Sequence, residues 1–83
     1  MAKDHPDLQE LLKFLAVSLV DAPDEVLVEE MEEDGAAVFE LTVAEEDLGK
    51  VIGKQGRIAN ALRTVAKASA MKNKQKVYVE IIA

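Results

Sequence analysis

The sequence predicts one small α+β domain, with a three-stranded mixed sheet and three helices packed on one face of that sheet. Three observations support this prediction. Apolar residues recur with a helical period near the N-terminus, two alternating segments flank an Asp-Gly turn, and a second helical region precedes a last alternating segment. The resulting order is α-β-β-α-α-β. A sheet covered on one face would bury all these apolar stripes together.

The first predicted helix covers about residues 6–20. Pro6 suits its first turn, because the N–H that proline lacks would have no partner there. Five leucines recur with the spacing of one helix face: Leu8, Leu11, Leu12, Leu15 and Leu19. Phe14 and Val17 lie on the opposite face and are expected to be exposed. Pro23 stops the helix, because it biases the residue before it toward an extended conformation.

Residues 25–43 are predicted to form a hairpin. Val26 and Val28 alternate with outward residues in its first strand, and four apolar residues alternate in its second: Ala37, Phe39, Leu41 and Val43. Asp34-Gly35 supplies the positive φ that a tight turn requires. The acidic residues around the turn would not converge on one cation, because neighbours in a strand point to opposite faces. We therefore expect no metal site and no cofactor.

The second half of the chain predicts two helices and a strand. Acidic residues 45–47 favour a helix start near Leu48, and Gly53 ends that short helix. A longer helix is predicted from Arg57 to Met71. Its expected apolar face carries Ile58, Ala61, Leu62, Val65 and Ser69, and its expected solvated face carries Asn60, Arg63, Thr64 and Lys67. The last predicted strand alternates from Val77 to Ile82.

The charge is divided unevenly along the chain. Residues 1–48 contain 15 acidic side chains and two lysines, whereas residues 49–83 contain eight basic side chains and one glutamate. The net charge of −6 would by itself argue against a nucleic-acid partner. A fold that separates the two halves into an acidic and a basic surface can nevertheless bind an anion on the basic one.

Length and composition exclude several classes of protein. With 83 residues the chain is expected to form a single domain over residues 1–83, in which residues 1–5 fray. We expect a cytoplasmic protein, because there is no signal peptide, no apolar stretch near the ~20 residues of a membrane span, and no Cys. An enzyme is not expected, because no nucleophile, base and orienting group form a set.

The segment 49–58 contains the residues that could form an anion-binding site. Gly53 and Gly56 enclose two polar residues between predicted helices, so that backbone N–H groups can approach an anion closely. This is not a nucleotide-binding P-loop, because three residues instead of four separate Gly49 from Gly53. Gln55 also stands where a Ser or Thr hydroxyl would hold magnesium.

Two basic residues in this segment lie at a helix N-terminus, where a positive charge is unfavourable. Lys54 and Arg57 oppose the macrodipole of the following helix, which costs about 0.3–1 kcal/mol each. A bound phosphate would compensate both charges and the unpaired N–H groups at once. The alternative is a joint between two helices that needs the glycines for its turn alone.

The run from Val51 to Ile58, in this α-β-β-α-α-β order, resembles the centre of a type II KH domain with its GXXG loop at Gly53–Gly56. The length and the run from Pro23 to Val26 before the first strand are similar to those of the small, single-domain bacterial RNA-binding proteins of the KhpA family. The resemblance implies a loop that clamps a single RNA strand while about four bases lie in a groove beside it.

The resemblance also implies which residues contact RNA. Backbone N–H contacts would come from Gly53, Lys54, Gln55 and Gly56, with charge from Lys54 and Arg57 and a second contact from Lys50. Ile52 and Ile58 are candidates for the apolar groove wall, although core packing explains both equally well. The variable loop beside the groove would contribute Lys72, Lys74 and Lys76. Asn60 replaces a basic residue that would extend the phosphate track, which implies weaker affinity.

Two functions remain open from the sequence. The first is single-stranded RNA binding by a non-catalytic RNA chaperone or post-transcriptional regulator. The second is a protein-interaction module that uses the same fold, with Phe14 and Val17 at the partner surface. The KhpA family is associated with homodimers and with a KhpB-like RNA-binding partner, whereas a membrane or a small-molecule substrate is not expected. Of the three aromatic residues, two are expected in the core, so no platform for successive bases is predicted.

Overall fold

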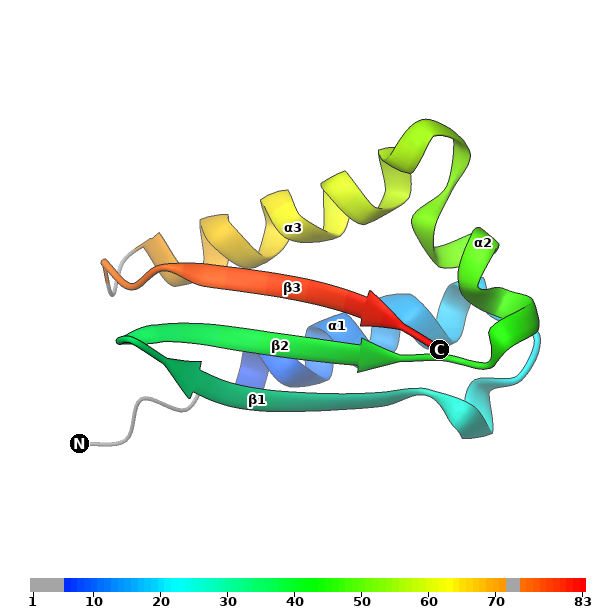
Figure 1. The fold of residues 1–83 in the computed structure, drawn as a ribbon, viewed down its shortest axis with the longest axis horizontal. Coiled ribbons are helices and arrows are strands. Elements are labelled where there is room, and N and C mark those ends of the chain that lie inside the picture. Colours follow the sequence, from blue (N-terminus) through cyan, green and yellow to red (C-terminus); the bar gives the residue numbers. More distant parts are fainter. Residues whose placement is uncertain (1–5, 72–73) are drawn as a thin grey trace.

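A computed structural model describes residues 6–71 and 74–83 and confirms the predicted α+β class and element order (Figure 1). The main elements are α1 (Pro6–Leu19), β1 (Leu27–Glu33), β2 (Ala36–Thr42), α2 (Leu48–Ile52), α3 (Arg57–Ala70) and β3 (Val77–Ile82). The described element boundaries lie within two residues of the predicted ones. Residues 1–5, which were expected to fray, and Lys72 lie outside the described residues.

The three strands form one mixed sheet in the order β1-β2-β3. β1 and β2 are antiparallel, with Val28 opposite Leu41, and β2 and β3 are parallel, with Phe39 opposite Val79. The hairpin turn is the predicted one, because Asp34 and Gly35 both have positive φ, of 53° and 82°. Helix α3 runs back to the end of the sheet where β3 starts, and β3 therefore runs parallel to β2 (Figure 1).

The core lies between one face of the sheet and the helices. The sheet contributes alternate residues, and α1 contributes a narrow stripe: Val28, Phe39, Leu41, Val77 and Val79 from the strands, and Leu8, Leu12 and Ala16 from α1. This burial confirms the predicted inward residues of the strands, but the predicted alternation is wrong for part of β2, because Ala36 and Val38 are buried as well. The leucine face of α1 is only partly correct, because Leu11 is exposed and Ala16 is fully buried in line with Leu8 and Leu12.

The predicted inward face of α3 is wrong in part. Its buried residues are Ala59, Leu62, Ala66 and Ala70, whereas Ala61, Val65 and Ser69 are exposed and Ile58 is half-buried. Small alanine side chains allow the helix to lie close to β3 and α1, which the bulkier side of the helix would prevent. The helix is therefore rotated relative to the prediction, and Arg63 lies half-buried beside β3 where a solvated position was expected.

The exposure of α1 and of the aromatic residues differs in detail from the prediction. Phe14 is exposed as expected, at 66% of its surface, but Val17 is half-buried and packs against the core. Phe39 is the one aromatic side chain in the core among the described residues, because Tyr78 is 51% exposed. Two aromatic rings therefore reach the surface, on α1 and on β3.

The described helices are all too short or too polar to cross a membrane. Within residues 6–71 and 74–83 no three His, Asp or Glu side chains are placed to hold one metal ion together.

Candidate nucleic-acid interface

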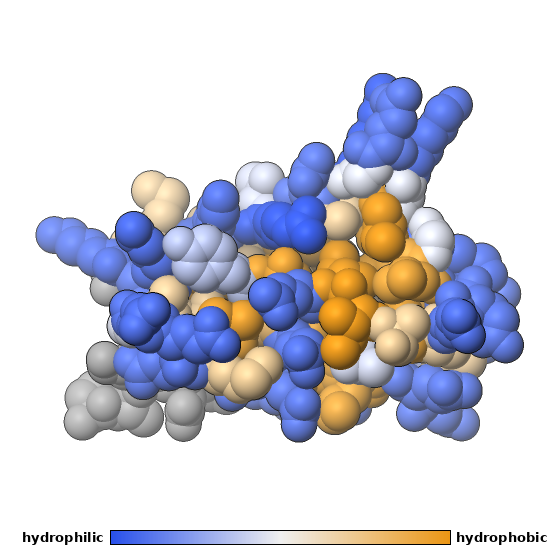
Figure 2. Space-filling model, in the orientation of Figure 1, coloured by the Kyte–Doolittle hydropathy of each residue, from blue (hydrophilic) through white to orange (hydrophobic). Residues whose placement is uncertain are grey.

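The loop Gly53–Gly56 projects from the molecule at the junction of α2 and α3, where hydrophilic side chains extend into solvent (Figure 2). Lys54 and Gln55 are exposed at its tip. Three of its residues have positive φ: Gly53 (78°), Gln55 (58°) and Gly56 (74°). Glycine adopts such values without steric cost, and a polar residue such as Gln55 adopts the left-handed region at a modest one. This backbone makes the turn sharp enough to start α3 directly after it.

Hydrogen bonds inside the loop decide which backbone groups remain available. The Gly53 N–H donates to Gly49 O over 2.9 Å, and the Gly56 N–H donates to Gly53 O over 3.2 Å. The N–H groups of Lys54 and Gln55 open the short 3₁₀ turn Lys54–Gly56, and the first N–H groups of a helical turn have no partner within it. The N–H donors expected at Gly53 and Gly56 are thus engaged within the loop, and Lys54 and Gln55 present theirs at the tip.

Basic side chains continue from the loop along α3. Arg57, Arg63 and Lys67 follow one another from its first turn to its last. Arg63 is held in place, because its Nε donates to Val79 O over 3.3 Å and its Nη1 donates to Asn60 Oδ1 over 3.2 Å. Asn60, which the sequence suggested only as a gap in the phosphate track, therefore orients the next basic residue.

The bond to Val79 lies at the outer edge of the sheet. Ala37 N–H donates to Lys76 O and Val43 N–H donates to Ile82 O, so the even-numbered carbonyls of β3 face β2. Because successive carbonyls of a strand alternate in direction, Val79 O faces the outer edge, toward α3. Arg63 thus bridges α3 and the outer edge of β3 and fixes their spacing.

Apolar side chains lie between the loop and the sheet. Ile52, Ile58 and Ile81 are half-buried there, and Ile58 and Ile81 also pack against the core. Figure 2 shows an apolar area at the centre of this face, near the C-terminal end of β3 and beneath the loop. The proposed groove-wall residues Ile52 and Ile58 are thus both partly exposed, and Ile58 also packs against the core.

Asp47 anchors the base of α2. It is 1% exposed, and its two carboxylate oxygens accept hydrogen bonds from the backbone N–H groups of Asp21 (3.1 Å) and Ala22 (3.0 Å). These bonds, chiefly the one from Asp21, lower the pKa of the Asp47 carboxyl below 3.8, against the opposing effect of burial. Asp47 therefore ties the loop after α1 to the helix that carries the GXXG loop.

Lys50 belongs to the same network. Its Nζ lies 2.5 Å from Asp21 Oδ2 and 3.4 Å from Asp47 Oδ1, and the hydrogen bond to Asp21 raises the pKa of Lys50 above 10.5. Lys50 was expected to be a second RNA contact. The structure engages it in ion pairs on α2, so that it would have to leave them to reach a phosphate.

The basic loop before β3 is described in part. Lys74 and Lys76 are exposed, and Lys74 has a positive φ of 54°. Gln75 Nε2 donates to Gly35 O over 3.3 Å, which joins this loop to the hairpin turn. Lys74 and Lys76 are thus at the opposite end of α3 from the GXXG loop (Figure 1).

Comparison with known proteins identifies the fold and the family. The family model "KhpA/KhpB, KH domain" matches residues 9–81, which includes every described helix and strand apart from the first three residues of α1 and the last residue of β3. The chain belongs to the KhpA/KhpB KH-domain family. Its α-β-β-α-α-β order and mixed sheet are those of a type II KH fold, in which Gly53–Gly56 joins α2 to α3.

Individual members of the family are similar over almost their whole length. RNA-binding protein KhpA of Clostridium acetobutylicum is 57% identical over 75 residues, which are 90% of this chain and 100% of that protein. The KhpA protein of Caldanaerobacter subterraneus is 58% identical over 73 residues, 88% of this chain and 97% of that protein. The KhpA protein of Treponema pallidum is 49% identical over 74 residues, 89% and 92% of the two chains.

Solved structures of a larger protein share the fold. Era in complex with MgGDPNP and nucleotides 1506–1542 of 16S ribosomal RNA superposes with a TM-score of 0.62 at 22% identity, over 90% of this chain and 29% of that one. A variant of Aquifex aeolicus Era gives a TM-score of 0.63 at 22% identity, over 100% of this chain and 34% of that one. This chain thus spans about a third of the Era chains that it matches.

Sequence reasoning on this KH domain missed Asp47, Asp21 and Tyr78. An acidic residue at the start of α2 indicated only a favourable helix N-terminus, yet the Asp47 side chain makes no cap bond to its own helix. Its partners lie 25 and 26 residues earlier in the chain, and no local pattern reveals them. Neither the exposure of Tyr78 nor its charged neighbours on α3 were predicted.

Proposed function

We propose that this chain binds single-stranded RNA through its GXXG loop, which clamps the sugar-phosphate backbone. The observation that carries the proposal is the pair of backbone N–H groups at Lys54 and Gln55, which open a turn at an exposed, positively charged tip. Within the described part of the chain, neither Lys54 nor Arg57 forms an ion pair. Phosphate oxygens supply the acceptors and the negative charge that this tip lacks.

The groove beside the loop accommodates the bases. Ile52 and Ile58 are half-buried below the loop, and the outer edge of β3 lies opposite α3. A KH groove of this kind holds about four nucleotides, with the backbone on the loop and the bases against apolar side chains. Binding by a KH domain in this manner requires no catalytic group, and the chain acts as a non-catalytic RNA chaperone or post-transcriptional regulator. The name RNA-binding protein of its KhpA relatives supports this role.

The remaining basic residues contribute unequally. Arg57 directly follows the loop and adds charge at the clamp. Lys50 adds a contact only when it leaves Asp21 and Asp47, so its share is smaller than that of Lys54. Lys74 and Lys76 are exposed in the variable loop and contact RNA that extends past the groove, whereas Lys72 lies outside the described residues.

The test is fluorescence anisotropy with a labelled, unstructured RNA and the variant Lys54→Asp/Gln55→Asp. Both glycines stay, and Asp is among the residues that best tolerate the positive φ of position 55, so the turn is kept. The matched control is Lys13→Asp/Ser18→Asp on the exposed side of α1, which changes the net charge by the same amount. We expect the loop variant to lose binding and the control to keep it. Equal binding by both variants would refute the clamp.

A second function is favoured by one observation. Phe14 exposes 66% of its surface on α1, where Leu11 is also exposed. A protein-interaction module would place a partner chain there, either a second copy or a KhpB-like RNA-binding protein. Val17 packs against the core and would contribute only its half-exposed side.

The two functions are compatible, because pairing two weak RNA sites raises the overall affinity without a new contact at either site. A homodimer or a heterodimer would then bind RNA more tightly than one chain. If the native protein binds no RNA at low salt, at concentrations that also favour pairing, protein interaction becomes the leading function.

A further inference from the structure

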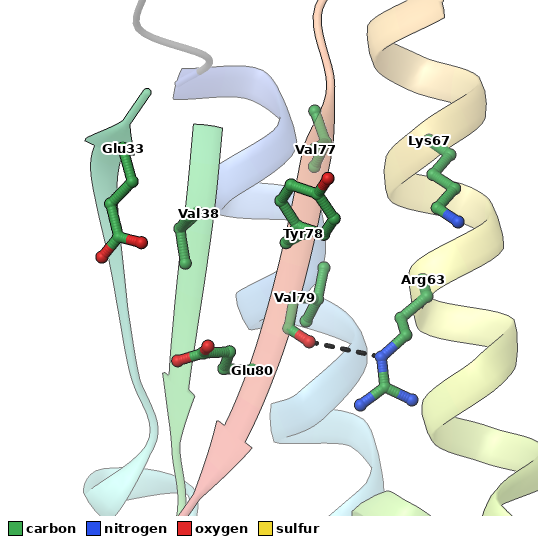
Figure 3. A pocket seen from close by; sticks show the side chains of 8 residues that line it. All are labelled: Glu33, Val38, Arg63, Lys67, Val77, Tyr78, Val79 and Glu80. Atoms are coloured by element: carbon green, nitrogen blue, oxygen red, sulfur yellow. Dashed lines mark hydrogen bonds between the residues drawn. The ribbon is translucent and has the colours of Figure 1, made fainter. Parts of the chain in front are cut away.

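Tyr78 lines a hollow that the phosphate clamp does not use (Figure 3). The hollow has a volume of about 260 Å³ and lies between α3 and the open face of the sheet. Val38 of β2 lines it next to the Tyr78 ring, whereas Val77 and Val79 border it at β3 and direct their side chains into the core on the other face of the sheet. Its charged lining is formed by Arg63 and Lys67 from α3 and by Glu33 and Glu80 from the sheet.

The position of the hollow follows from the course of α3. The helix starts at the GXXG loop and runs alongside β3 in the opposite direction, so that its C-terminal half lies beside the start of β3 (Figure 1). Lys67 is eleven residues beyond Gly56, which corresponds to about 16 Å along a helix axis. An RNA strand that leaves the loop along the β3 side of α3 therefore passes Arg63 and reaches the hollow.

We propose that this hollow is a stacking subsite for one further nucleobase of the same RNA strand, beyond those in the groove. The proposal rests on the RNA-binding function proposed above and extends it. The Tyr78 ring is half exposed at the surface, as stacking on a base requires. The volume is below the ~300–1,000 Å³ of sites for drug-sized ligands and suits one planar base.

The two walls of the hollow contact different parts of the nucleotide. Arg63 uses two of its N–H groups on Val79 and Asn60, which fixes the guanidinium and leaves further donors for a phosphate. Lys67 lines the same hollow from the next turn of α3, with its side chain directed along the helix (Figure 3). The phosphate thus lies against α3, and the base lies against Tyr78.

The carboxylates on the sheet side select among bases. Glu33 and Glu80 are acceptors without donors, so they favour bases that carry an exocyclic amino group. Cytosine, adenine and guanine have such a group, with two N–H donors, whereas uracil offers a carboxylate only its single ring N3–H. The subsite therefore prefers cytosine over uracil, and Glu80→Gln weakens that preference because an amide also donates.

The test compares RNA lengths by fluorescence anisotropy. The probes are labelled oligocytidylates of four and eight nucleotides and an oligouridylate of eight. The variants are Tyr78→Leu, which removes the ring but keeps apolar bulk, and Tyr78→Phe, which keeps the ring. Tyr78→Leu is expected to weaken binding of the cytidylate octanucleotide by roughly five- to hundredfold and to leave the tetranucleotide unchanged. Tyr78→Phe is expected to match the native protein with both.

The outcomes separate this proposal from the one on which it rests. If Tyr78→Leu binds the octanucleotide as the native protein does, the subsite is refuted while the clamp stands, and the hollow is left to a protein partner. Equal weakening of both lengths also refutes it, because Tyr78 would then act within the main groove or on the fold. If the native protein binds neither length at low salt, the RNA-binding function fails and the subsite fails with it.

Discussion

A Cβ atom on Gly53 would lie 2.6 Å from Cγ1 of Ile58 and 2.9 Å from its Cβ. Real Cβ atoms do not approach other carbons this closely, so the first residue of the GXXG loop and the first apolar residue of α3 fit only because position 53 has no side chain. Gly53 also has φ 78° and ψ 174°, a region that glycine alone adopts readily. The second glycine differs, because a Cβ on Gly56 would meet nothing closer than Asn60, at 4.0 Å.

This difference predicts unequal effects of the two Gly→Ala changes. Gly56→Ala is expected to cost about 1–2 kcal/mol of unfolding free energy, from its left-handed backbone alone. Gly53→Ala is expected to cost more, because the contact with Ile58 is added to the backbone strain. Urea denaturation measures both values. Combining Gly53→Ala with Ile58→Ala should recover part of the loss, and strictly additive effects would show that the contact with Ile58 is not the cause.

The carboxylate of Asp47 predicts a loss of stability in acid. Its pKa is below 3.8 in the folded state, so the folded protein binds fewer protons than the unfolded one as this group titrates. The stability that ionised Asp47 contributes is therefore complete above about pH 4 and is lost as the pH falls through the folded pKa. Urea denaturation of the native protein and of Asp47→Asn between pH 6 and pH 2.5 measures the effect. The native protein should be more stable at pH 6, and this advantage should shrink at the acid end. A constant difference across this range would count against the assignment.

Salt dependence predicts a ranking among the basic residues. Each phosphate that a cation neutralises on single-stranded RNA contributes about −0.7 to the slope of log affinity against log salt. Lys54→Ala and Arg57→Ala should each reduce the slope by about this amount. Lys50→Ala should change it less, because Lys50 is paired with Asp21 and Asp47. A larger effect at Lys50 than at Lys54 would move the phosphate track from the loop to α2.

Exposure on α1 predicts opposite results for two neighbouring residues. Phe14→Ser should change the unfolding free energy by no more than about 0.5 kcal/mol, because Phe14 is mostly exposed. If a second copy docks there, the same change reduces self-association in analytical ultracentrifugation. Val17→Ser should destabilise the fold because Val17 packs against the core. Unchanged self-association of Phe14→Ser would exclude this surface as the interface between copies.

Periodicity and turn residues predicted where the helices and strands lie, but not which side of α3 packs inward. Val65 and Ala61 were placed in the apolar stripe by hydropathy, whereas the structure buries Ala59 and Ala66. Alanine is nearly neutral in hydropathy, and it is preferred where a helix lies close to a sheet, which depends on the whole packing. The rotation of α3 then turns Arg63 toward β3, so the hollow at Tyr78 could not be predicted either.

The GXXG loop itself was predictable from the sequence, because two glycines two residues apart between helices admit few conformations. The hydrogen bonds within the loop were not predictable from the sequence. Four N–H donors were expected, and the Gly53 and Gly56 groups are instead bonded to Gly49 and to the loop. Only Lys54 and Gln55 start the turn with N–H groups that the turn does not use.

The most direct measurement is therefore an NMR titration of the ¹⁵N-labelled protein with an unstructured tetranucleotide. The backbone amides of Lys54 and Gln55 are expected to shift strongly, together with those of Arg57 and Ile58, while the amides of α1 stay in place. Binding that shifts other amides and leaves those of Lys54 and Gln55 unchanged would contradict the claim that the GXXG loop clamps the RNA backbone.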